Sequence, residues 1–151
     1  MKKTISAISA LFMALVLLTL TACSAQLSEQ EYADKIMPAY KTYVSKLVEA
    51  ATMQFTEGSQ EEITAALDEA SAALDEIEQL NPPAIYSAQH QSICEAMQYA
   101  REEIAINKRI AEEGESDELL ELLEAAASET DFHDKMLTLA KHLREDGYYS
   151  W

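Results

Sequence analysis

Residues that break helices occur at few places in this chain, and they divide it into segments of helix length. The three glycines are Gly58, Gly114 and Gly147, and two of the three prolines are adjacent, at Pro82 and Pro83. Between these points the sequence is rich in Ala, Leu, Glu and Gln, which are strong helix formers. Runs of β-branched residues, which are typical of strands, do not occur there. The sequence therefore predicts an all-α fold.

Apolar residues within these segments recur at steps of three and four, the spacing of one face of a helix. We expect four helices, over residues 28–57, 59–81, 82–113 and 116–147. The positions predicted to face the core are Tyr32, Ile36, Tyr40, Tyr43, Leu47 and Ala51; Ile63, Leu67, Ala70, Leu74 and Ile77; Tyr86, His90, Ile93, Met97, Ala100 and Ile104; and Leu119, Leu123, Ala126, Thr130, His133, Leu137 and Ala140.

The connections between the expected helices are at most a few residues long. Short connections force successive helices to run antiparallel, so residues 29–147 should form an up-down-up-down four-helix bundle. Capping boxes of the form Ser-x-x-Glu mark the first two helix starts, at Ser28 and at Ser59. Pro38 lies inside the first helix and should kink or loosen its early turns. The stretch at 128–130, which holds the weaker helix formers Ser128 and Thr130, marks a point where the last helix can break.

The first 23 residues have the layout of a secretory signal. Lys2 and Lys3 precede an uncharged, mostly apolar run that ends in Leu20-Thr21-Ala22-Cys23. These four residues resemble the lipobox of bacterial lipoprotein precursors. The resemblance implies cleavage after residue 22, a diacylglyceryl group on the Cys23 thiol, and a lipidated tether over residues 23–28. The alternative is an uncleaved transmembrane helix, but the strongly apolar part is far shorter than the roughly 20 residues that a span requires.

Charge limits the partners of the mature chain. The sequence holds 11 basic and 27 acidic residues, a formal net charge of −16. Loss of residues 1–22 would remove two lysines and leave nine basic against 27 acidic residues, or −18. Such a field repels phosphate backbones, so we expect no nucleic-acid partner. It also repels anionic headgroups, so the body should not lie flat on the membrane.

The sequence carries no catalytic motif, and we expect neither an enzyme nor a resident cofactor or metal. One set of soft ligands has an alternative interpretation. His90 with His142, and Cys94 with Met136, lie at similar distances from the turn near residue 115, so they fall at similar heights in an antiparallel hairpin. They could hold Cu(I) or Zn if their faces converge, but buried His, Cys and Met are more often core residues.

Two further observations concern the mature part. The passage Leu80-Asn81-Pro82-Pro83, followed by Tyr86 and His90, is similar to a helix-turn-helix passage in small helical bacterial lipoproteins. The resemblance implies a helical surface lipoprotein and assigns no activity. Residues 148–151, the aromatic tail, follow the last glycine, and we expect them to cap the bundle end or to touch lipid headgroups.

The function predicted from the sequence is a lipid-anchored, non-enzymatic interaction module on the extracytoplasmic face of a bacterial membrane. Its contacts would be the membrane, through the lipid on Cys23, and an envelope protein. The alternative is an extracytoplasmic carrier of a metal or small ligand that uses the bundle interior.

Replacement of the lipidated cysteine tests the anchor. Because a Ser hydroxyl cannot take the place of the modified thiol, Cys23→Ser should abolish labelling by a radioactive fatty acid and leave the precursor uncleaved. Metabolic labelling and N-terminal sequencing measure the two effects. A variant that is still cleaved and still partitions into detergent would contradict the lipobox interpretation.

Overall fold

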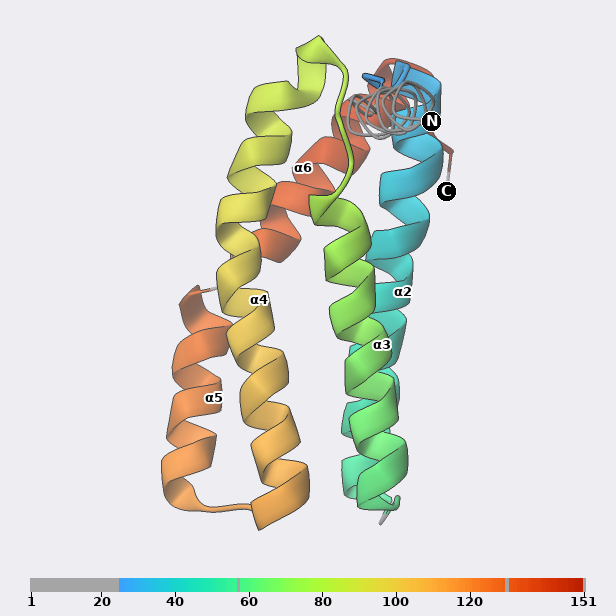
Figure 1. Ribbon diagram of the computed structural model, residues 1–151. Helices are drawn as coiled ribbons and strands as arrows, with labels where there is room; N and C mark the ends of the chain where they lie inside the picture. Colours follow the sequence, from blue (N-terminus) through green and yellow to red (C-terminus); the bar gives the residue numbers. More distant parts are fainter. Residues whose placement is uncertain (1–24, 57, 130, 151) are drawn as a thin grey trace, which may run out of the picture.

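The chain is helical almost throughout the computed structural model, which describes residues 25–56, 58–129 and 131–150. The described part contains five α-helices and no strand (Figure 1). The elements are α2 (Glu29–Phe55), α3 (Gln60–Glu78), the 3₁₀ turn η1 (Ala84–Tyr86), α4 (Ser87–Glu113), α5 (Asp117–Glu129) and α6 (Phe132–Glu145). The predicted signal segment and Cys23 lie outside the described residues. Within those residues, no helix combines the length and apolar character that crossing a bilayer requires.

The predicted helix boundaries are confirmed where local chemistry sets them. The Ser28 hydroxyl accepts a hydrogen bond from the backbone N–H of Glu31 at 3.2 Å, and the Glu31 carboxylate accepts one from the backbone of Ser28 at 3.0 Å. Ser59 and Glu62 repeat the arrangement at the start of α3. Gly114 has φ of +85°, in the left-handed region where a residue without Cβ is not strained. α2 runs without interruption through Pro38.

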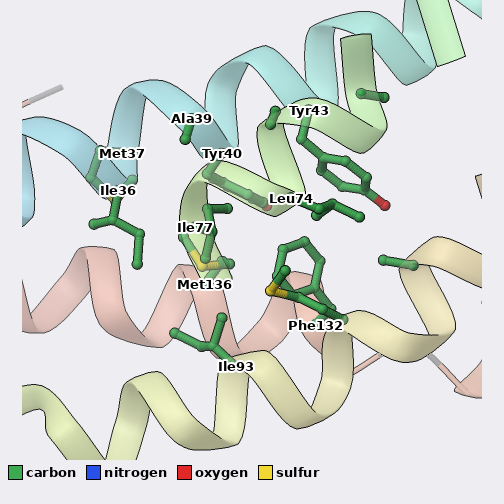
Figure 2. Packing of buried hydrophobic residues seen from close by; sticks show 14 of the residues in the cluster. Ile36, Met37, Ala39, Tyr40, Tyr43, Leu74, Ile77, Ile93, Phe132 and Met136 are labelled. Atoms are coloured by element: carbon green, nitrogen blue, oxygen red, sulfur yellow. The ribbon is translucent and has the colours of Figure 1, made fainter. Parts of the chain in front are cut away.

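Four helices surround the main core. α2 pairs with α3 and α3 with α4, and α6 lies against both α4 and α2. Figure 2 shows Tyr43 of α2, Leu74 of α3, Ile93 of α4 and Met136 of α6 with their side chains in the same interior. Leu74, Ile93 and Met136 are completely buried. All the positions that the sequence predicted as core in the second and third helices are buried.

α5 lies outside this core. It packs on the C-terminal half of α4, beside which it runs in Figure 1. The contact has its own small apolar cluster, formed by Ile106 and Ile110 of α4 with Leu119, Leu123 and Ala126 of α5. α6, in contrast, enters the main core. The end of the bundle that contains α6 therefore has four helices around its interior, whereas the other end has α5 on the outer side of α4.

The sequence predicted one helix over residues 116–147, and this expectation is wrong. Its helix ends at Glu129 and a second one begins at Phe132, in the region of the weaker helix formers Ser128 and Thr130. The break changes which residues after it face the core. The buried residues of α6 are Phe132, Met136, Leu139, Ala140 and Leu143, whereas the predicted His133 is exposed and Leu137 is 41% exposed.

Both ends of the described chain are fastened to the same end of the bundle. The backbone N–H of Leu27 donates to the carbonyl of Asn81 at 3.0 Å, and the Gln26 amide donates to the carbonyl of Pro82 at 3.0 Å. At the other terminus, the carbonyl of Tyr148 accepts a hydrogen bond from Gln30 at 3.2 Å. Tyr148 and Tyr149 are partly buried against the core, as the cap interpretation of the tail expects. Trp151 lies outside the described residues.

The register of α6 can be tested with two leucines that are two residues apart. Leu139 is completely buried, so Leu139→Ala should lower the free energy of unfolding by about 2–5 kcal/mol. Leu137 is 41% exposed, so Leu137→Ala should cost less than about 1 kcal/mol. Urea denaturation of the two variants measures both changes. A larger loss for Leu137→Ala would restore the uninterrupted helix that the sequence predicted.

Candidate functional site

His90 and Cys94, two of the proposed metal ligands, are neighbours on α4. His90 is 6% exposed, and its Nε2 lies 3.5 Å from the Cys94 Sγ. Its Nδ1 lies 3.0 Å from the hydroxyl of Tyr32, whose ring meets the imidazole edge-on. Burial lowers the pKa of His90 and raises the pKa of the Cys94 thiol. Both groups are therefore neutral at pH 7, and both ring nitrogens of His90 have partners within the protein.

The other two proposed ligands do not complete a site. Met136 is completely buried among the core residues. His142 is exposed, and its Nδ1 lies 3.3 Å from the side-chain oxygen of Gln89. In the described ranges, no three side chains of the His, Cys, Asp and Glu types are grouped so that they could hold a metal ion. The structure thus brings His90 to Cys94 but does not add a third ligand of these types.

A groove of about 340 Å³ opens where α6 begins, between α2 and α4. Its lining residues are Tyr43, Val44, Leu47, Val48 and Ala51 from α2, Glu103 from α4, and Phe132 and His133 from α6. Because α5 packs on α4, this part of α2 has no fourth helix beside it. Val48 is 60% exposed, and Phe55, one turn beyond the groove, is 87% exposed.

Aromatic packing fixes the end of the groove at α6. Phe132 is buried, and its ring meets the rings of Tyr40 and Tyr43 edge-on, with centroids 6.0 and 5.3 Å apart. Figure 2 shows Phe132 lying below Tyr43 in the interior. The Tyr40 hydroxyl shares a hydrogen bond with Nδ1 of His133. Burial raises the pKa of Tyr40 to about 12, so this hydroxyl stays protonated at neutral pH. These contacts hold His133 at the mouth of the groove.

Glu103 is the acidic group of the groove. It is half-buried, and desolvation raises the pKa of its carboxyl above the ordinary value of 4.5. The salt bridges in the described part of the chain do not include it. Cations on the same helix and on α2 are bound to other carboxylates: Lys46 to Glu49 and Glu69, Arg101 to Asp75 and Glu78, and Lys108 to Asp68. Glu103 is therefore a carboxylate that lacks a cation in a partly desolvated place.

The groove combines apolar walls with one carboxylate, which suits binding of an apolar segment that carries a cation. Sequence reasoning placed Tyr43, Leu47 and Ala51 in the core and did not single out Val44, Val48 or Glu103. One signal was present: Val44, Val48 and Phe55 extend the apolar face of this helix beyond the width that one neighbouring helix covers. The position of Glu103 beside them depends on how α4 is placed, which the sequence did not reveal.

Comparison with known proteins adds no relative: no family model, curated protein or solved structure matches this chain.

The carboxyl of Glu103 should make stability depend on pH. Because its folded pKa is raised, ionisation costs folding free energy, and stability falls as pH rises through that pKa. Glu103→Gln should therefore raise the urea midpoint at pH 7, and this excess over wild type should shrink as pH falls through the raised pKa and be lost below the ordinary value of 4.5. Glu102→Gln, on the exposed neighbour in α4, is the control. An excess of the same size at pH 4 and pH 7 would show that desolvation of Glu103 is not its cause.

Proposed function

We propose that this protein is a lipid-anchored helical binding module on the extracytoplasmic face of a bacterial membrane, and that it binds its partner in the groove between α2 and α4. Its architecture would be an up-down-up-down four-helix bundle with a divided fourth helix, which follows a cleaved signal peptide. Anchorage would be through Cys23, and the activity would be binding rather than catalysis.

The observation that carries this proposal is the apolar surface of α2 next to the groove. Val48 and Phe55 are 60% and 87% exposed on a helix whose N-terminal half holds most of its buried residues. Scattered exposed apolar residues need no explanation, but Val48 lines the groove and Phe55 lies one turn beyond it, and apolar surface gathered in this way marks an interaction site. Proteins that bind helical segments use grooves of this kind, with apolar side chains at successive turns.

The position of the groove is suitable for a partner in solution. The contacts of Gln26 and Leu27 with the connection after α3 hold the start of α2 at the end of the bundle that the proposed lipid on Cys23 would anchor. The groove begins at Tyr43, 14 residues into α2, and thus roughly 20 Å further along the helix at about 1.5 Å per residue. It would therefore open away from the lipid surface.

The carrier alternative has narrower support. For a metal carrier it rests on the contact between His90 and Cys94, which lacks a third ligand among the His, Cys, Asp and Glu side chains of the described chain. A small apolar ligand would use the mostly apolar groove and not the core at the α6 end, because that core is filled by side chains with little or no exposure. The groove volume of about 340 Å³ lies near the lower limit for such ligands.

Selection of binding peptides tests the groove as a binding site. A displayed library of helical 14-residue peptides, randomised on all faces, is selected against the mature protein. The enriched peptides should bind wild type and lose at least about tenfold in affinity for Ala51→Gln, because the longer side chain fills the groove from an exposed helix position.

Ala72→Gln makes the same substitution at an exposed position of α3 outside the groove, and it should leave binding unchanged. If the library yields no binding peptide, or if the enriched peptides bind Ala51→Gln as well as wild type, the groove is not the binding site and the proposed function is wrong.

A further inference from the structure

The groove lies where a fourth helix is missing, and this limits the shape of its occupant. α6 has 14 residues and α2 has 27, so α6 spans roughly 21 Å against roughly 40 Å at about 1.5 Å per residue. The uncovered part of α2 runs from Val44 to Phe55 and would accept about three turns of helix. Val44, Val48, Ala51 and Phe55 follow at steps of four, three and four, which is the spacing of one helix face.

Charge limits the occupant further. Glu103 lines the groove outside the salt bridges of the described structure, in which Lys46, Arg101 and Lys108 are paired with other carboxylates. A positively charged side chain brought by the occupant would pair with Glu103 in a partly desolvated place, where such a pair is stronger than on an open surface. An acidic or uncharged occupant would leave this carboxylate without compensation.

Three other occupants fit these observations less well. A second copy of this chain brings the same net charge of −16, and its leucine-rich helix α5 carries Glu118, Glu121 and Glu124. The protein's own α5 has the same acidic residues and already buries Leu119 and Ala126 against α4. Anionic lipid would be repelled by this charge, and the groove lies away from the anchored end.

We infer that the groove binds an amphipathic helix of another protein, one with aliphatic side chains on one face and a Lys or Arg that pairs with Glu103. This inference rests on the proposed function and specifies the partner for the same groove. The helix would lie in line with α6, would cover Val44, Val48 and Ala51, and would place its basic residue against α4.

The charge pair can be isolated with a double-mutant cycle. The peptides enriched on wild type should contain a Lys or Arg at one fixed helix position. One such peptide is compared with its Gln variant by fluorescence anisotropy against wild type, Glu103→Gln and Glu102→Gln. The Gln peptide should bind wild type and Glu102→Gln about tenfold more weakly than the basic peptide. Against Glu103→Gln, the two peptides should bind within about twofold of each other, because the partner charge is gone.

The outcomes separate this inference from the proposed function. Some peptides could bind Ala51→Gln more weakly than wild type and yet prefer a basic residue as strongly with Glu103→Gln as with wild type. That result would overturn the charge pairing, and the groove would remain the binding site. Absence of any groove-dependent peptide would overturn both. A wild-type protein that dimerises in analytical ultracentrifugation, and that Ala51→Gln makes monomeric, would identify a second copy as the occupant and overturn the basic helix. Thermal unfolding of each variant, followed by circular dichroism, confirms that it is folded at the assay temperature.

Discussion

The packing of Phe132 between α2 and the rest of the core is the constraint on which this structure depends. Its ring is buried against Tyr40 and Tyr43, and it is the first residue of α6. Once Phe132 enters the core, the following turns place Met136, Leu139 and Leu143 inside. The preceding helix cannot continue along the same axis and packs on α4 instead. The packing of Phe132 thus marks the boundary between two ends of the bundle. At one end four helices enclose the core, and at the other end α2 is partly uncovered.

Local chemistry explains why much of the fold was predictable from the sequence. The capping boxes at Ser28 and Ser59, and the glycine at 114, act through neighbouring backbone atoms, and each is confirmed. The second and third helices follow a strict apolar repeat, so their buried residues could be read directly. The prediction for the last helix was wrong at one point. A break near residue 130 was foreseeable from composition, but the rotation after it depends on which residue, Phe132 or His133, finds the better-packed environment, and that is a tertiary property.

The candidate site was less predictable for the same reason. Ala51 belongs to the apolar stripe of the first helix and is nevertheless exposed, because the helix that should cover it lies elsewhere. Glu103 has the sequence context of an ordinary solvent-facing glutamate, and only the approach of α2 and α6 makes it half-buried. The raised pKa of the Glu103 carboxyl, which belongs to none of the salt bridges in the described part of the chain, is a local cost of the kind that binding sites commonly retain.

The hydrogen bonds of Gln26 and Leu27 would shorten the connection between the helical body and the proposed lipid on Cys23. With the lipid on Cys23, as proposed, only residues 24 and 25 separate the anchor from the first fastened side chain. Two residues reach at most about 7 Å. The helical body would then be held close to the membrane by a short tether, with little freedom to move away from it. Its rotation relative to the membrane would be restricted. The groove would therefore stay at a nearly constant height above the lipid surface. A partner would reach the groove only if its helix is presented at that height.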